Sequence, residues 1–98
     1  MSGDFIPASE AHRLGIVYKV TPPDELMETA RELAATIASR APLAVSMAKE
    51  LVNRGLDASL PTAIAQEMGM ASTLYASEDA QEGIAAFREK RPPAFNGR

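Results

Sequence analysis

Apolar residues recur along this chain at the 3.6-residue spacing of amphipathic helices, and Pro, Gly and Ser residues divide the pattern into five segments. The expected helix starts are at Ser9, Thr21 with Pro22, Pro42, Ser59 and Ser77, where such residues cap or begin a helix. Gly15 is expected to end the first helix in a left-handed conformation. Apolar stripes are expected in the second helix through Leu26, Ala30, Leu33 and Ile37, and in the fourth through Ile64, Met68, Ala71 and Tyr75. The predicted helices cover approximately residues 9–14, 22–40, 42–54, 59–76 and 77–91. The pattern therefore predicts an all-α fold of four to five short amphipathic helices.

One segment departs from the helical pattern. Residues 16–20 read Ile-Val-Tyr-Lys-Val, and β-branched residues of this kind favour one short extended segment. Backbone N–H and C=O groups in a strand need a partner, and no second strand-like run occurs in the sequence. The unpaired segment is the first indication that part of the fold lies outside these residues.

Composition narrows the class of protein. The 98 residues carry a net charge of -3 and contain no Cys, so disulfides, thiolate metal sites and a Cys nucleophile are excluded. The mild acidity gives no reason to expect nucleic acid as a partner. No apolar run reaches the roughly 20 residues of a membrane-spanning helix, and the first seven residues do not resemble a signal peptide. We expect one helical domain in the cytoplasm.

The titratable residues do not form a recognisable catalytic or metal-binding motif. His12 is the only histidine, and no partner at a suitable spacing supports a general-base role. The acids in Ser77–Asp79 are explained by capping of a helix start. Three further acids lie at helical spacing and fit a solvated face better than a metal site: Glu25, Glu28 and Glu32. We therefore expect no metal.

A cluster near the carboxyl terminus is more informative. It combines one aromatic ring with four cations: Phe87, Arg88, Lys90, Arg91 and Arg98. On a continuous helix, Phe87, Lys90 and Arg91 would share a face, where a ring can stack on a base and a cation can bind phosphate. The alternative is a basic helix end that balances the helix dipole, and spacing alone favours this alternative.

The same region resembles a known family. Residues 77–95, SEDAQEGIAAFREKRPPAF, look like the carboxyl-terminal signature of the crotonase superfamily, the enoyl-CoA hydratase/isomerase family. Residues 8–17, 20–26 and 42–49 resemble earlier segments of that family in the same order. The resemblance implies that residues 1–98 are a carboxyl-terminal helical region, concerned with oligomerisation and the CoA side of the site. It also implies that the amino-terminal catalytic core is absent.

The resemblance implies an activity for the intact protein. That activity is enolate chemistry on an acyl-CoA thioester in fatty acid metabolism, with hydration of 2-enoyl-CoA, a lyase reaction, as the commonest case and isomerisation as another. The 98-residue chain alone is expected to be inactive, with no catalytic residue of its own. The alternative is a free-standing helical module for protein interaction, without catalysis.

The resemblance also implies roles for particular residues and partners. Phe87 and Lys90 match the family's ring and lysine near the adenine and phosphates of CoA, whereas Arg91 carries no implied role. No cofactor is expected beyond coenzyme A as part of the substrate. The intact enzyme is expected to be a homotrimer or hexamer, without a nucleic-acid or membrane partner.

Overall fold

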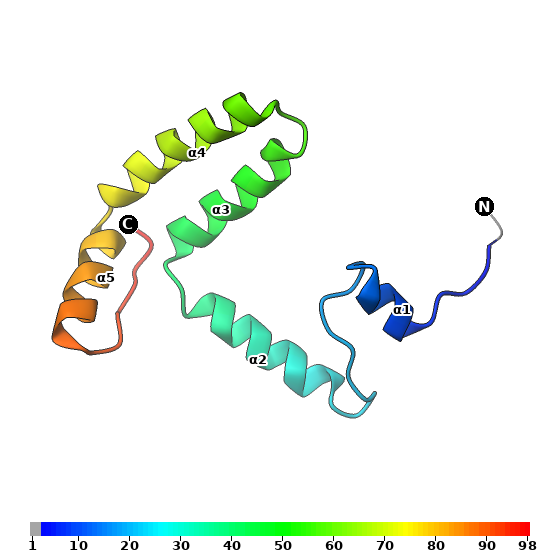
Figure 1. Cartoon of the computed structure of the whole chain (residues 1–98). Helices are drawn as coiled ribbons and strands as arrows, with labels where there is room; N and C mark the ends of the chain where they lie inside the picture. The colour runs from blue at the N-terminus through cyan, green and yellow to red at the C-terminus, as the bar shows by residue number, and fades with distance from the viewer. Residues whose placement is uncertain (1–2) are drawn as a thin grey trace. The chain divides into compact units, whose positions relative to one another are not determined.

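The computed structural model describes residues 3–98, which form five helices and no strand (Figure 1). The helices are α1 (Ala8–Arg13), α2 (Leu26–Ala38), α3 (Pro42–Gly55), α4 (Leu60–Tyr75) and α5 (Glu78–Glu89). The all-α prediction is confirmed. The chain divides into two compact units, Met1–Leu33 and Ala34–Arg98, with the boundary inside α2.

The first unit corrects the extended segment predicted at residues 16–20. Gly15 adopts a left-handed conformation with φ 74°, as the sequence predicts, and turns the chain back over α1. The Ile16 amide then donates to the Ala11 carbonyl at 2.9 Å, and the Gly15 amide donates to His12 at 3.0 Å. These two bonds are the Schellman pattern of a helix end, so residues 16–18 form bends instead of a strand.

The predicted cap of the first helix is wrong. The helix starts one residue before Ser9, at Ala8, and no side chain caps it. Pro7 precedes the helix, and its carbonyl accepts the amides of Glu10 and Ala11, both at 3.0 Å. Ser9 is therefore inside the first turn and cannot serve as the cap.

The predicted start of the second helix is also wrong. Helix α2 begins at Leu26, several residues after the expected cap at Thr21. Pro22 and Pro23 have no backbone N–H to donate. The first hydrogen bond in this region closes a turn, in which the Glu25 amide donates to the Pro22 carbonyl at 3.1 Å. The Thr21 hydroxyl is buried and has no hydrogen-bond partner among the described residues.

The second unit is built on three helices. Helices α3 and α4 lie antiparallel and side by side, and α4 also packs against α5 (Figure 1). The predicted starts of these helices are confirmed. Pro42 opens α3, the Ser59 hydroxyl accepts the Thr62 amide at 3.4 Å, and the Ser77 hydroxyl accepts the Ala80 amide at 3.1 Å.

The carboxyl-terminal segment, residues 91–98, folds back along α5 (Figure 1). Its amides and side chains bond to acids on α5, and Phe95 packs against Gly83, where an added Cβ would lie 3.7 Å from the ring. The segment follows the helix without adding regular structure. It therefore covers one face of α5.

Little of the described chain is buried. Only Ala86, 1% exposed, and Asp79, 3% exposed, count as buried among residues 3–98. The predicted apolar stripe of α2 is exposed along its length, and on α4 the predicted stripe through Ile64 and Met68 is exposed as well. Half-buried residues of α4, including Leu74, face its neighbours instead. The apolar helix faces are thus largely without a partner in this structure.

No helix in residues 3–98 combines the length and the apolar character needed to cross a bilayer.

Candidate functional site

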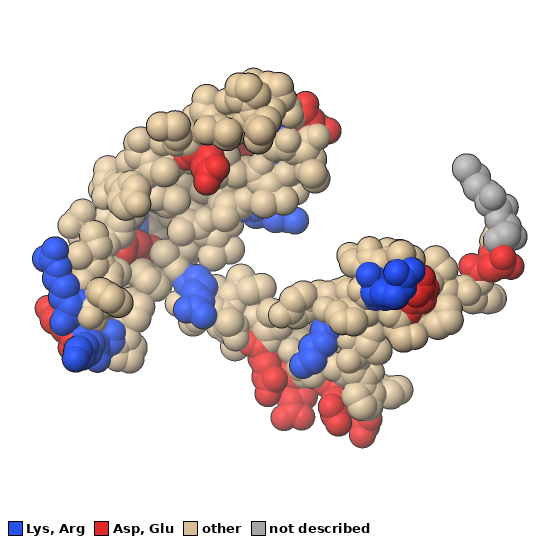
Figure 2. Space-filling view, viewed as in Figure 1, with Lys and Arg blue, Asp and Glu red and all other residues tan. Residues whose placement is uncertain are grey.

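The two predicted CoA contacts, Phe87 and Lys90, lie at the carboxyl end of α5. Phe87 is 85% exposed, with no side chain of the described residues covering it. Lys90 is exposed, and its ammonium forms no ion pair within residues 3–98. Figure 2 shows Lys and Arg side chains gathered over α5. The structure therefore presents an accessible ring and an accessible cation three residues apart.

The helical face expected to unite these residues with Arg91 does not exist. Helix α5 ends at Glu89, and Lys90 follows in the left-handed conformation with φ 55° and ψ 39°. Arg91 precedes Pro92, and a residue before proline is disfavoured in the helical conformation. The chain therefore leaves the helix before Arg91, and the common face predicted for Phe87, Lys90 and Arg91 is wrong.

Arg91 is instead bound by two acids of α5. Its guanidinium donates to both carboxylate oxygens of Glu82, at 2.6 and 2.9 Å, and to Glu89 at 2.6 Å. The Ala94 amide donates to the same Glu82 carboxylate at 2.8 Å. We call Glu82, Glu89 and Arg91 the Arg91 ion-pair cluster. With two carboxylates around one guanidinium, this cluster has no excess positive charge to attract a phosphate.

Charge in this cluster is stabilised by its own hydrogen bonds. The Arg91 guanidinium, followed by the Ala94 amide, lowers the pKa of Glu82 to about 2 from an ordinary value of 4.5. The Glu82 and Glu89 carboxylates in turn raise the pKa of Arg91. Both partners are therefore ionised at any pH near neutrality, and the pair persists.

Arg98 does not join the basic cluster. Its carbonyl accepts the amide of Asp79 at 3.0 Å, which places its backbone at the amino end of α5. Since α5 has 12 residues, the two ends of the helix are about 16 Å apart. The four cations predicted around Phe87 thus separate into exposed Arg88 and Lys90, paired Arg91, and distant Arg98.

Asp79 has a structural role that the sequence did not reveal. Its buried carboxylate accepts the Asn96 amide at 2.7 Å and the Gly97 amide at 2.9 Å. Glu78 accepts the Asn96 side-chain amide at 3.2 Å. Ser77 caps α5 as predicted, but Asp79 holds the carboxyl-terminal segment, and no local spacing could have indicated a contact 18 residues away.

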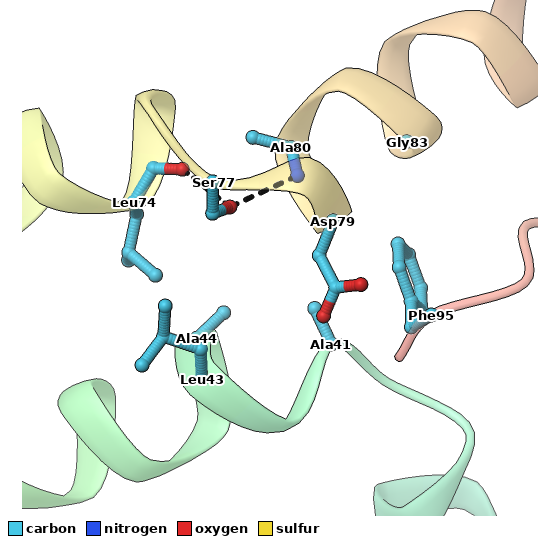
Figure 3. Close-up of a pocket in the computed structure, with 9 residues that line it drawn as sticks. All are labelled: Ala41, Leu43, Ala44, Leu74, Ser77, Asp79, Ala80, Gly83 and Phe95. Atoms are coloured by element: carbon cyan, nitrogen blue, oxygen red, sulfur yellow. Dashed lines mark hydrogen bonds between the residues drawn. The ribbon is translucent and has the colours of Figure 1, made fainter. Parts of the chain in front are cut away.

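A cavity of about 210 Å³ lies between the start of α3, the end of α4, α5 and the carboxyl-terminal segment (Figure 3). Phe95 stands on one side of it, with Leu43 and Leu74 across from the ring (Figure 3). The Ser77 hydroxyl donates to the Leu74 carbonyl at 2.7 Å and accepts the Ala80 amide. The polar atoms at this cavity are already bonded, so its chemistry suits only an apolar group.

The other titratable candidates remain apart. His12 Nδ1 lies 3.2 Å from the Val17 carbonyl oxygen, and no acid contacts the ring in the described chain. The acids of α2 are exposed on their helix, where Figure 2 shows red side chains gathered. Within residues 3–98, no group of three or more His, Cys, Asp or Glu side chains could hold a metal ion.

Comparison with known proteins identifies the family. The profile described as enoyl-CoA hydratase/isomerase matches residues 1–98 of this chain. The chain belongs to the enoyl-CoA hydratase/isomerase family. A short-chain-enoyl-CoA hydratase of Clostridium acetobutylicum is 44% identical over 86 residues, which make up 88% of this chain and 33% of that protein. The 2,3-dehydroadipyl-CoA hydratase of Escherichia coli is 40% identical over 98 residues, or 100% of this chain and 38% of that protein.

A solved structure gives the same result for the enoyl-CoA hydratase/isomerase fold. The crystal structure of an enoyl-CoA hydratase subunit from Geobacillus kaustophilus superposes with a TM-score of 0.92 at 42% identity, covering 99% of this chain and 38% of that one. The predicted family and helical fold are therefore confirmed. The chain spans between 33% and 38% of the length of these three relatives. These shares do not say which part of each relative is matched, so the carboxyl-terminal placement stays a prediction.

Proposed function

We propose that the gene product carrying this chain hydrates 2-enoyl-CoA thioesters, and that this chain contributes contacts to the CoA part of the substrate. The observation that supports the proposal most is the pairing of an uncovered ring, Phe87, with an unpaired cation, Lys90, at one end of α5. An aromatic face can stack on adenine, and an ammonium can bind phosphate. Family membership supplies the reaction class.

The reaction class requires groups that this chain does not bring together. Addition of water to an enoyl thioester builds negative charge on the thioester oxygen, which fixed N–H donors stabilise while carboxylates transfer protons. The acids of the Arg91 ion-pair cluster are bound to Arg91, and Asp79 is bound to backbone amides. We therefore propose that residues outside 1–98 perform the chemistry, and that the isolated 98-residue chain is inactive.

Two relatives of this chain are named for substrates with different acyl groups. The Clostridium acetobutylicum relative is named for short-chain enoyl-CoA and the Escherichia coli relative for 2,3-dehydroadipyl-CoA, yet their identities to this chain are 44% and 40%. Since two such different acyl groups accompany similar identities, these residues are not expected to select the acyl group. We therefore propose that these residues contact the CoA part of the thioester and not its acyl group.

A direct assay tests this function. The purified gene product is mixed with crotonyl-CoA, and loss of the ultraviolet absorbance of the conjugated thioester is followed. We expect hydration by the gene product and none by the 98-residue chain alone. Absence of turnover with every enoyl-CoA tried would contradict the proposed activity, and turnover by the isolated chain would contradict its dependence on other residues.

The exposed apolar faces support a proposal about assembly. Large apolar residues are exposed on both α2 and α4, among them Leu26, Ile37 and Leu60. Large apolar patches exposed on a protein surface mark interaction sites. We propose that these faces pack within a homotrimer or hexamer of the gene product. A monomer in analytical ultracentrifugation at high concentration would contradict this assembly.

The same exposed faces favour a second candidate, a helical interaction module without catalysis. The two candidates differ in their ligand. The hydratase binds CoA thioesters, whereas the module associates with protein and leaves CoA unbound. Equilibrium dialysis of the gene product against labelled coenzyme A separates them, because binding supports the hydratase and absence of binding supports the module.

A further inference from the structure

The backbone of Lys90 is held in an unusual conformation. It is the only residue other than glycine with positive φ among those described, and bulky side chains disfavour this region. A glycine commonly occupies this position at a helix end. A lysine in place of glycine indicates a functional role for its side chain. Such a strained backbone persists only when neighbouring contacts hold it in place.

The neighbouring contacts are backbone bonds and the Arg91 ion-pair cluster. The Lys90 amide donates to the Phe87 carbonyl at 3.3 Å, and the Arg91 amide donates to the Ala86 carbonyl at 3.0 Å. These are the two bonds of the Schellman pattern. The Arg91 side chain then turns back to Glu82, which is one turn before Ala86 on α5, and ties the residue after Lys90 to the helix.

Glu82 also fixes the chain beyond the turn. Its carboxylate accepts the Ala94 amide at 2.8 Å in addition to the Arg91 guanidinium, so one side chain binds residues on both sides of the two prolines. The Glu82 side chain is 23% exposed, compared with 41% for Glu10 and 42% for Glu50, whose Arg partners lie in the same helix as the acid. The bidentate geometry and the partial burial favour a defined orientation.

We propose that Glu82 is a positioning residue for the CoA nucleotide: by binding Arg91 and the Ala94 amide it keeps Lys90 in the left-handed conformation, which fixes where the Lys90 ammonium meets a phosphate. The inference rests on the proposed function, because it assumes that Lys90 contacts CoA. Glu82 itself takes no part in the chemistry. Glu82 affects binding of the nucleotide part of the substrate and does not affect binding of the acyl end.

The test compares two substrates in the gene product. Crotonyl-CoA carries the nucleotide phosphates, whereas crotonyl-pantetheine lacks them. We expect Glu82→Gln to raise the KM for crotonyl-CoA about threefold to fivefold, the scale of one partly exposed charge contact, with kcat unchanged. The KM for crotonyl-pantetheine should stay the same. Arg91→Gln should reproduce this result and add nothing to Glu82→Gln, since the two side chains act together.

The matched control is Glu50→Gln. Glu50 pairs with Arg54 on α3 at 2.6 Å, the same distance as the Glu82–Arg91 pair, but it does not contact the segment that follows α5. It should change neither KM. In a Lys90→Ala background, Glu82→Gln should cause no further rise in the KM for crotonyl-CoA.

Four results overturn the inference. Equal increases in KM for both substrates would show a general structural role, and an undiminished effect of Glu82→Gln in the Lys90→Ala background would show that Glu82 does not act through Lys90. If Lys90→Ala alone leaves the KM for crotonyl-CoA unchanged, the CoA contact itself is contradicted, and this inference falls with it. If Lys90→Ala raises KM while Glu82→Gln does not, only the positioning role is contradicted.

Discussion

Arg91 and Glu82, nine residues apart, are joined by two parallel hydrogen bonds of 2.6 and 2.9 Å between guanidinium and carboxylate. This pair closes the turn that ends α5 and leaves Phe87 and Lys90 uncovered beside it. Arg91 and Glu82 bind each other and not a ligand, but their ion pair fixes the path of the backbone at the predicted CoA contact.

The Glu82–Arg91 pair predicts a specific pH dependence of stability. The pKa of Glu82 is lowered from 4.5 to about 2 in the folded state. The stabilisation by its ionised form is therefore complete above the unfolded pKa and is lost as the pH falls through the folded pKa. We expect the stability difference between the wild type and Glu82→Gln to be constant above pH ~5 and to shrink towards pH ~2.

Denaturant unfolding of the gene product at about pH 7, 5, 4 and 3 measures the stability difference between the wild type and Glu82→Gln. The Arg91→Gln variant is the reference, because it removes the main cause of the lowered pKa. In that background, the difference should depend much less on acid pH, because only the Ala94 amide still lowers the pKa of Glu82. A difference that grows as the pH falls would have the wrong sign for this account.

Phe87→Leu is expected to raise the KM for crotonyl-CoA about fivefold or more, because loss of a stacked base costs on the order of 1 kcal/mol. Phe87→Tyr, which keeps the ring, is the matched control and should restore the wild-type KM. Steady-state kinetics of the gene product provide the measurement. If leucine serves as well as the two aromatic residues, the ring does not stack on the substrate.

Lys90→Gly should separate backbone strain from ligand binding. Glycine adopts positive φ without steric cost, so the variant should be more stable to unfolding by about 1 kcal/mol. Lys90→Ala retains the strain and is the control. Thermal unfolding of both variants supplies the stabilities. A glycine variant no more stable than the alanine variant would indicate that φ 55° at this residue carries no strain.

Asp79→Ala should detach the carboxyl-terminal segment from α5. It removes the acceptor of the Asn96 and Gly97 amides, and hydrogen bonds to a buried charge are each worth about 1.5–3 kcal/mol. We expect unfolding to become easier by about 3 kcal/mol or more, the lower end for the two bonds together, and the two amides to exchange hydrogen faster. Glu78→Ala, which removes only the exposed contact to Asn96, should have a much smaller effect on both measurements.

Several features of this fold were predictable because they depend on local sequence. Pro42, Ser59 and Ser77 marked three helix starts through the geometry of the first turn, and Gly15 marked a helix end through its left-handed conformation. In each case, the residues involved are close in the sequence. Their effect on the backbone could therefore be read without knowledge of the tertiary structure.

The predictions were wrong where contacts between distant residues, or contacts that compete with local preference, determine the backbone conformation. The β-branched run after Gly15 predicted an extended segment, but the hydrogen bond from Ile16 to Ala11 turns the chain into bends. The basic residues after Phe87 predicted one helical face, but Pro92 and the ion pair to Glu82 end the helix earlier. Pro92 was a usable signal, whereas the contact with Glu82 has no signature in residue spacing.

The candidate CoA contacts came from resemblance and not from spacing. Residue spacing alone favoured a basic helix end over a binding site at Phe87 and Lys90. The structure shows that both side chains are accessible, which the proposed contact requires. A CoA contact also needs the rest of the site, so its test uses the gene product.

The KM of the gene product for crotonyl-CoA, with Lys and then with Ala at residue 90, tests the central claim most directly. Crotonyl-pantetheine serves as the reference substrate. A CoA contact predicts that Lys90→Ala raises the KM for crotonyl-CoA by up to about fivefold and leaves the KM for crotonyl-pantetheine unchanged. An unchanged KM for crotonyl-CoA would contradict the claim that this end of α5 binds the substrate.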